Sequence, residues 1–293
     1  IFFKIKMNII NGNQLAANLN SDLSNKIAQL KFKYGKTPYL VVIIVGDNPA
    51  SHVYVRNKEK KALEVGIKSL IVKLDKDIEE KNLLNTIHKY NDNDEVDGIL
   101  VQLPLPAHIN TNRIIDEIRY DKDVDGFNSK NIGLLALGRP TVIPCTPLGC
   151  YKMLEHSTKL EGKNAIVLGR SNIVGKPLSY LLTNKNVTVT LAHSKTRKIE
   201  AMCKNNDIII AAIGKPNFVK KEWVNKKAII IDVGINVLKR HNGSSYIAGD
   251  VDYEEVSKKV AAISPVPGGV GPMTIHCLLL NTFSLAKKRN NLS

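Results

Sequence analysis

The sequence predicts an α/β fold made of two domains, and three observations lead to this expectation. The chain has 293 residues, whereas a single domain usually contains about 100–200. Several short runs are continuously apolar, which is typical of parallel strands that are buried on both faces. Helical stretches alternate with these runs, first in the N-terminal half and again in the C-terminal half, and this β-α-β order favours parallel sheets with crossover helices.

The N-terminal half contains three predicted strands. The apolar run Tyr39–Val45 is the first, and residues 70–74 and 98–102 are the other two. Helices are expected between them, over about residues 51–65 and 79–91. These elements together predict one α/β domain.

A second set of elements fills the C-terminal half. A helix is expected at 173–183, and strands are predicted at 164–168, 187–191, 207–212, 228–232 and 261–264. Between the two halves, Gly138–Pro147 contains three prolines, which suits a crossing between domains better than the interior of an element. Residues 273–288 have a helical pattern, and we expect this helix to return to the first domain.

The composition excludes several classes of protein. Four cysteines in this length exclude a disulfide scaffold, and their spacing lacks the C-x-x-C pairs typical of zinc. The net charge of +15 would suit a nucleic acid or an acidic membrane. The basic residues are spread along the chain, however, and aromatic residues, at 5%, are too few for a surface that stacks bases. We therefore expect no binding to nucleic acid. No run of 18 apolar residues occurs in the sequence, so we also expect a cytoplasmic protein that does not bind a membrane.

A glycine-containing turn connects the predicted strand 164–168 to the predicted helix 173–183. Its sequence is Gly169-Arg-Ser-Asn-Ile-Val-Gly175, with Ser171 where the middle glycine of a G-x-G-x-x-G motif would stand. Such a turn directs backbone N–H groups and the positive end of a helix toward a diphosphate. Glycine turns of this kind also occur in α/β folds that bind nothing, so the turn alone leaves both interpretations open.

The next predicted strand indicates which dinucleotide would bind. NAD-binding folds place an Asp or Glu at the end of this strand, about 20 residues after the turn, to hold the ribose 2′-hydroxyl. Here residues 187–191 are followed by Ala-His-Ser-Lys-Thr, which contains no acid. Ser194, Lys195 and Arg170 could instead donate hydrogen bonds to a 2′-phosphate. NADP is therefore favoured over NAD, unless the segment is only a polar loop.

Polar side chains in the N-terminal half form a second candidate group. Tyr54 and Lys58 are four residues apart in a predicted helix and therefore lie on one face, although such a pair can also be a packing contact. Gln102 ends a predicted strand, where ligands of open α/β sheets bind. The acidic segment Asp121–Gly126 could be a solvated turn or a cation site, with fewer ligands than an EF-hand loop.

These residues belong to longer stretches that identify a family. The sequence resembles the bifunctional methylenetetrahydrofolate dehydrogenase/methenyltetrahydrofolate cyclohydrolase family from Met7 to about Lys288. The resemblance rests on residues 45–51 with Tyr54 and Lys58, and on residues 97–106, 121–127, 144–147, 169–177, 232–236 and 265–274. Each stretch is weak evidence alone, but their number and order make coincidence an inadequate explanation.

The resemblance implies an activity and a set of site residues. Such enzymes oxidise 5,10-methylenetetrahydrofolate with NADP and then hydrolyse the methenyl product to 10-formyltetrahydrofolate, in one active site within a cleft between two domains. Lys58 matches the catalytic lysine, Tyr54 the tyrosine that packs against the folate, Gln102 the partner of the lysine, and Asp125 the carboxylate that anchors the pterin. The implied cofactor-binding residues are Gly169, Arg170, Ser171, Ile173, Ser194 and Ile235, and the implied substrate-binding residues are Tyr54, Asp125, Pro267, Gly268 and Gly269.

The resemblance also implies the domain organisation. It predicts a three-layer α/β catalytic domain over residues 1–146, completed by a C-terminal helix at 273–293, and a Rossmann-type NADP-binding domain over 147–272. Folate one-carbon derivatives are the expected partners, with a homodimer joined through the cofactor domain, and no metal is required. Whether Lys58 acts as acid, base or charge stabiliser stays open.

Three alternatives compete with this interpretation. The first is a dehydrogenase without cyclohydrolase activity, against which the presence of Tyr54, Lys58 and Gln102 counts. The second is a basic nucleic-acid-binding protein, which should have a clustered basic face and stacking aromatics. The third is a binding subunit without catalysis, which would tolerate the loss of Lys58.

Overall fold

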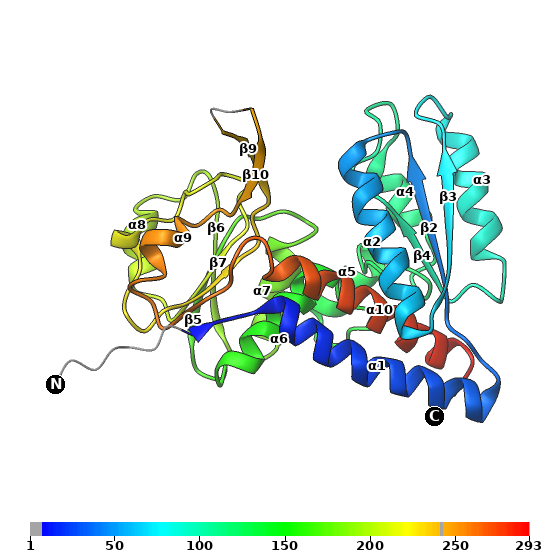
Figure 1. Ribbon diagram of the computed structural model, residues 1–293, viewed down its shortest axis with the longest axis horizontal. Coiled ribbons are helices and arrows are strands. Elements are labelled where there is room, and N and C mark those ends of the chain that lie inside the picture. Colours follow the sequence, from blue (N-terminus) through cyan, green and yellow to red (C-terminus); the bar gives the residue numbers. More distant parts are fainter. Residues whose placement is uncertain (1–7, 241–242, 293) are drawn as a thin grey trace. The chain divides into compact units, whose positions relative to one another are not determined.

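The computed structural model describes residues 8–240 and 243–292, and they form two compact units (Figure 1). One comprises Ala17–Cys145 and the residues from Ile275 onward, and we call it the three-stranded unit. The other comprises Thr146–Thr274 and the described residues up to Ala16, and we call it the six-stranded unit. The division falls within the first and last helices, α1 (Gly12–Tyr34) and α10 (Val270–Arg289).

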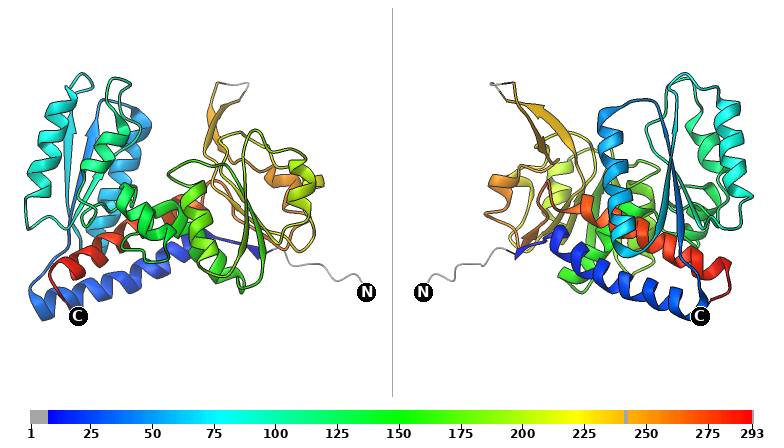
Figure 2. Two further views of the ribbon diagram at one scale, coloured as in Figure 1. Left: turned by 180° about the vertical axis from the view of Figure 1, so that it is seen from behind. Right: turned by 45° about the vertical axis from the view of Figure 1, so that its right-hand side comes forward.

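The three-stranded unit is built on a parallel sheet of strand order β3-β2-β4. The strands are β2 (Tyr39–Val45), β3 (Lys68–Leu74) and β4 (Gly98–Val101). Helices α2 (Pro49–Val65) and α3 (Glu80–Asn91) connect them and lie on opposite sides of the sheet, as Figures 1 and 2 show. Six of the seven β2 residues are buried, as expected for a central strand covered on both faces.

Further helices complete this unit. Helix α4 (Thr111–Glu117) packs beside α3, where Ile114 joins Val41, Leu83 and Ile87 in one apolar cluster. Helix α5 (Ser129–Ala136) follows, capped by Asn128, whose side-chain oxygen accepts a hydrogen bond from the Lys130 amide. Helix α1 had no counterpart among the predicted elements.

The six-stranded unit contains a parallel sheet of order β1-β11-β8-β7-β5-β6. Its strands are β1 (Asn8–Ile9), β5 (Asn164–Leu168), β6 (Thr188–Ala192), β7 (Ile208–Ala211), β8 (Ile229–Asp232) and β11 (Ala262–Ile263). The helical elements are α6 (Cys145–Ser157), α7 (Gly175–Thr183), α8 (Ile199–Lys204), α9 (Tyr253–Val256) and the 3₁₀-helix Lys221–Trp223. A separate hairpin of β9 (Asn236–Lys239) and β10 (Ser245–Ala248) projects from this unit (Figure 1).

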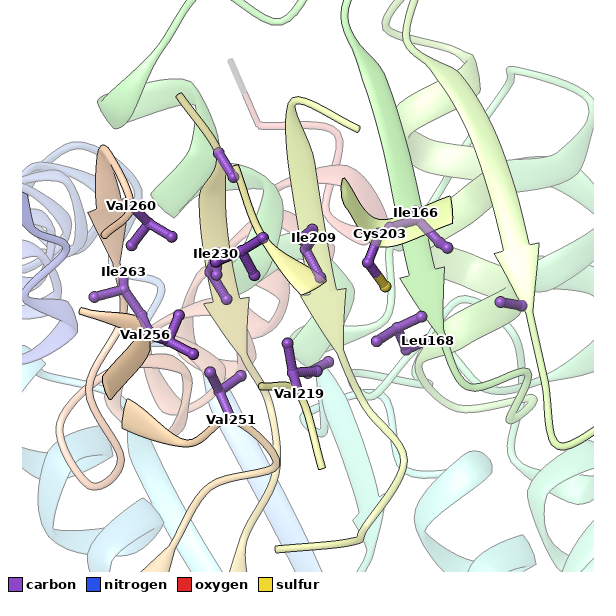
Figure 3. Packing of buried hydrophobic residues seen from close by; sticks show 14 residues of the cluster. Ile166, Leu168, Cys203, Ile209, Val219, Ile230, Val251, Val256, Val260 and Ile263 are labelled. Atoms are coloured by element: carbon purple, nitrogen blue, oxygen red, sulfur yellow. The ribbon is translucent and has the colours of Figure 1, made fainter. Parts of the chain in front are cut away.

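Apolar side chains of neighbouring strands fill the core of the six-stranded unit. Figure 3 shows Ile166, Ile209, Ile230 and Ile263 side by side on successive strands, each with no exposed surface. Val251, which follows the hairpin, and Val256 in α9 belong to the same apolar cluster and cover the same face of the sheet. This continuous apolar layer makes the sheet a rigid base for the loops at its carboxyl ends.

The structure confirms the predicted fold class, and most predicted strands and helices lie within a few residues of their expected positions. It differs from the predicted domain limits at the N-terminus. The sequence predicts a first domain over residues 1–146, but β1 pairs in parallel with β11, and the described residues up to Ala16 belong to the six-stranded unit. The segment Gly138–Pro147 is predicted to cross between the domains, but its last residue, Pro147, lies in the first turn of α6. Proline is tolerated in the first turn of a helix, because the backbone N–H that it lacks would have no partner within the helix there. Among residues 8–240 and 243–292, no helix is long and apolar enough to cross a membrane.

Candidate active site

Lys58 and Gln102 form the centre of the site in the three-stranded unit. Lys58 lies in α2, whose first turn is held by a hydrogen bond from the Ser51 amide to the Asn48 side chain. The Lys58 side chain is buried, with 8% of the residue exposed, and its Nζ donates to Gln102 Oε1 at 3.0 Å. Gln102 Nε2 donates to the Leu103 carbonyl at 2.7 Å, so the amide is oriented with its oxygen toward the lysine. A neutral acceptor holds Lys58 in place without adding a negative charge beside it.

Tyr54 precedes Lys58 by one helical turn, so the two side chains start from the same face of α2. Tyr54 is 39% exposed, and partial burial raises the pKa of its phenol. An aromatic ring that is half open to solvent beside a buried lysine can pack against a planar ligand. The structure therefore places Tyr54 and Lys58 in one helix, four residues apart.

Asp125 lies close enough to Lys58 for their charges to interact. Burial raises the pKa of the Asp125 carboxyl, while the positive charge of Lys58 and the nearby Cys145 thiol act in the opposite direction. The Cys145 thiol is itself buried, and burial and the nearby Asp125 charge raise its pKa well above the usual range. A lysine, a glutamine and a carboxylate thus lie near one another in the three-stranded unit.

The segment Asp121–Gly126 is held by its own buried charged residues. Lys122 has no exposed surface, and its Nζ donates to the carbonyls of Tyr90, Asn91 and Asn93 at 2.7–3.1 Å. Burial lowers its pKa to about 8. The Lys122 ammonium group is thus bonded to backbone carbonyls of residues 90–93, and no group of three or more His, Cys, Asp or Glu residues that could hold a metal is found in the described parts of the chain.

Asp123 organises the same loop from the inside. Its carboxylate accepts hydrogen bonds from the Gly126 amide at 3.0 Å, the Asn128 amide at 2.8 Å and the Asn131 side chain at 3.0 Å. Burial outweighs these three bonds and raises the pKa of Asp123 to about 7. The sequence predicts no role for Asp123, since its partners come together only in the folded loop.

This pKa predicts how the stability of the protein depends on pH. The folded state keeps the Asp123 proton up to about pH 7, whereas the unfolded chain releases it near pH 4. The folded state therefore binds more protons between these values, and its free energy of unfolding should fall as pH rises, by up to about 1.4 kcal/mol per pH unit. Urea denaturation at pH 5, 6 and 7 should show a shallower decline for Asp123→Asn; parallel profiles for the variant and the wild type would contradict this. Burial also raises the pKa of Asp232 to about 6, so the free energy of unfolding should still decline somewhat with pH in both the wild type and Asp123→Asn.

The glycine turn of the six-stranded unit lies where an open α/β sheet binds nucleotides. Strand β5 has β6 on one side and β7 on the other, so the turn after β5 is at the point where strand order reverses. Gly169 has φ of +114°, and a Cβ there would overlap the Ala212 carbonyl; a Cβ on Gly175 would overlap the Gly169 carbonyl. Backbone therefore passes so close that side chains are excluded at both positions.

The turn leads directly into α7, which has nine residues. Ser171 Oγ accepts hydrogen bonds from the amides of Val174 at 3.2 Å and Gly175 at 3.3 Å and so supports the start of this helix. Arg170, Ser171 and Ile173 are exposed. This is the shape and charge that a diphosphate requires: a tight glycine turn, a helix N-terminus and an accessible guanidinium.

The segment after β6 matches a 2′-phosphate better than a 2′-hydroxyl. Residues 193–196 form a turn in which the Thr196 hydroxyl accepts from the His193 amide at 2.9 Å. Ser194 and Lys195 are exposed on this turn, and no acid lies between Ala192 and Lys198. The residues present therefore fit NADP.

The remaining predicted residues also lie in the six-stranded unit. Ile235 is 50% exposed and follows β8, whose last residue, Asp232, accepts hydrogen bonds from the amides of Gly234 at 3.0 Å and Asp250 at 2.9 Å. Pro267 is exposed, whereas the carbonyl of Gly268 accepts a hydrogen bond from the Asn13 amide at 3.1 Å. Gly269 is buried against Gly12, so close that a Cβ on Gly12 would overlap the Gly269 carbonyl. The two groups of predicted residues are thus divided between the units.

A dinucleotide-binding α/β unit together with a second α/β unit that bears a buried lysine defines a class, the two-domain dinucleotide-dependent enzymes. Comparison with known proteins gives the family. Residues 10–125 match the family description "Tetrahydrofolate dehydrogenase/cyclohydrolase, catalytic domain", and residues 144–290 match "Tetrahydrofolate dehydrogenase/cyclohydrolase, NAD(P)-binding domain". The chain belongs to the tetrahydrofolate dehydrogenase/cyclohydrolase family.

Relatives resemble the chain over nearly its whole length. The bifunctional protein FolD of Streptococcus uberis is 52% identical over 282 residues, which are 96% of this chain and 98% of the relative. The crystal structure of the Campylobacter jejuni bifunctional enzyme FolD has a TM-score of 0.92 at 47% identity, covering 97% of this chain and 99% of that one. The Trypanosoma brucei enzyme, solved with NADP cofactor and an inhibitor, has a TM-score of 0.91 at 35% identity, covering 96% and 97%.

Proposed function

We propose that this chain oxidises 5,10-methylenetetrahydrofolate with NADP and hydrolyses the resulting methenyl compound to 10-formyltetrahydrofolate, with Lys58, Tyr54, Gln102 and Asp125 in the reacting site. The observation that carries the proposal is the Lys58–Gln102 hydrogen bond beside Asp125, in a chain whose other unit has a turn suited to NADP. The bifunctional relatives agree with both activities. A dehydrogenase without hydrolysis would need no such lysine.

The oxidation requires mainly that the folate be held in place. Bound NADP supplies the acceptor for the hydride that leaves the methylene carbon. Asp125 offers two acceptor atoms to the amino and ring N–H groups of the pterin, and the Tyr54 ring offers a flat surface for packing. The two nitrogens bonded to the methylene carbon already favour the loss of hydride, so positioning by these side chains provides most of the protein's contribution.

The hydrolysis requires a group that can hold and move a proton. Water adds to the carbon of the methenyl cation, and the bond from that carbon to one ring nitrogen breaks. Both protons of the water leave its oxygen, which becomes the formyl oxygen; one is taken up by this nitrogen and the other is released. The Lys58 Nζ, held by the Gln102 carbonyl, is the group suited to this transfer.

The substrate and cofactor contacts in the six-stranded unit are part of the same proposal. The Gly169–Gly175 turn and Arg170 would hold the diphosphate, Ser194 and Lys195 the 2′-phosphate, and Pro267 to Gly269 would contact the folate. Turnover with NADP and NAD in parallel tests this assignment. Faster turnover with NADP at equal low concentration is expected, and equal rates would remove the role of the turn after β6.

We also propose that the chain forms a homodimer through the six-stranded unit. The hairpin carries a cross-strand pair, Val237 opposite Ile247, with 68% and 41% of these residues exposed. Tyr246 on the same hairpin is 39% exposed. Apolar residues gathered on a protruding hairpin are typical of a surface that a second subunit covers.

The cytoplasmic location remains a prediction.

A charged residue on the hairpin should therefore separate the subunits. We expect Val237→Glu to sediment as a monomer at micromolar concentration where the wild type is a dimer. Lys226→Glu, at an exposed position of the same unit outside the hairpin, serves as the control and should leave the assembly largely intact. Identical sedimentation of wild type and Val237→Glu would show that this hairpin is not the interface.

A further inference from the structure

The C-terminal helix α10 contributes a buried amide to the surroundings of Asp125. Asn281 is 6% exposed, and its Nδ2 donates to the carbonyls of Val124 and Ile143, both at 2.9 Å. The Cys145 sulfur lies 3.6 Å from the same nitrogen. One side chain thus connects two segments that lie more than 130 residues before it in the sequence.

The first of these segments places Asp125. Val124 is fully buried, and its carbonyl accepts from both Asn281 and the Cys145 thiol, the latter at 3.2 Å. On the other side of Asp125, the Gly126 amide donates to Asp123. The peptide groups before and after Asp125 are therefore both fixed by buried side chains, and Asn281 acts on the first of them.

The second segment supports the loop from behind. A Cβ on Gly126 would lie 2.8 Å from the Pro144 nitrogen and 3.0 Å from the Ile143 carbonyl carbon, so backbone packs directly on backbone here. By binding the Ile143 carbonyl, Asn281 holds this segment against Gly126. Removing the amide would leave the Ile143 carbonyl without this donor and the Val124 carbonyl with the Cys145 thiol as its donor, and we expect the loop that carries Asp125 to shift in response.

We propose that Asn281 is a positioning residue for folate binding, acting on Asp125 through the Val124 and Ile143 carbonyls. This inference rests on the proposed role of Asp125 in anchoring the pterin. It assigns to α10 a part in substrate recognition that its sequence gives no reason to expect. Asn281 need not touch the substrate for this.

The test is a mutant cycle with kinetic readouts. Asn281→Ala should raise the KM for 5,10-methylenetetrahydrofolate about tenfold, with the KM for NADP unchanged. Asn281→Ser, which can donate only one hydrogen bond, should give an intermediate value and decides the question if the alanine variant does not fold. Thr282→Val is the matched control: Thr282 is buried and adjacent, but its hydroxyl donates to the Leu278 carbonyl of its own helix, and the folate KM should stay as in the wild type.

The Asp125→Ala background separates the inference from the function on which it rests. If Asn281 acts through Asp125, adding Asn281→Ala to Asp125→Ala should change the folate KM less than twofold further. An independent, multiplicative effect in the double variant would overturn the inference, as would a normal folate KM in both Asn281 variants. A normal folate KM for Asp125→Ala itself would instead reject the anchoring role of Asp125, and the inference with it.

Discussion

Lys58→Met should abolish most of the cyclohydrolase activity while NADP still binds. The methionine keeps the length and apolar stem of the side chain, so α2 should pack as before, but the group that moves the proton is gone. Positioned acid–base groups typically contribute about 10²–10⁴-fold, and we expect a loss in this range. The decay of added methenyltetrahydrofolate, followed by absorbance and corrected for its rate in buffer, measures the effect.

An exposed lysine on the same helix provides the control for this experiment. Lys60 lies two residues further along α2 and is exposed, so Lys60→Met should hydrolyse the methenyl compound at the wild-type rate. NADP affinity should be the same in all three proteins, because Lys58 and the glycine turn belong to different units. Hydrolysis by Lys58→Met within tenfold of the wild type would contradict the assigned role.

Gly175→Ala is the second substitution with a large expected effect. The new Cβ would overlap the Gly169 carbonyl and lie 3.0 Å from the Arg170 Cα, and neither backbone group can turn aside as a flexible side chain would. The turn must therefore open at the place proposed for the diphosphate. We expect NADP affinity to fall about 100-fold or more, which corresponds to about 3 kcal/mol. Titration of the protein with NADP measures this directly.

Two observations separate a damaged turn from a generally unfolded protein. Gly133→Ala in α5, where a Cβ would meet nothing within 4 Å, should bind NADP normally and should be as stable as the wild type or slightly more so. Gly175→Ala should also keep its hydrolysis of added methenyltetrahydrofolate, since Lys58 lies in the other unit. Normal NADP binding by Gly175→Ala would exclude this turn as the cofactor site.

The buried strands were the most predictable part of the fold. The continuous apolar runs Tyr39–Val45 and Asn164–Leu168 became β2 and β5 with the predicted limits, because a strand covered on both faces needs apolar residues at every position. Helix α1 was not predicted. Its buried residues Ala16, Leu23, Ile27 and Leu30 are widely spaced among asparagines, which have low helix propensity, so its apolar stripe is weak in the sequence.

The site shows the same division between local and long-range information. Tyr54 and Lys58 could be paired from their four-residue spacing, and Gln102 from its place at the end of a strand. Lys122 and Asn281 could not, because their partners are backbone carbonyls of distant segments. In the sequence, a lysine or asparagine that binds distant backbone carbonyls cannot be told from one that is exposed to solvent, because the carbonyls come close to it only in the folded chain.

The most direct test of the proposed function is one absorbance experiment with the purified protein, 5,10-methylenetetrahydrofolate and NADP. Reduced nicotinamide and the methenyl intermediate are followed in the same cuvette, and the decay of added methenyltetrahydrofolate is compared with its decay in buffer. We predict NADP reduction with little methenyl accumulation and a decay faster than in buffer. Reduction with methenyl accumulating would contradict the hydrolytic role of Lys58, and no turnover with either NADP or NAD would contradict the proposed function as a whole.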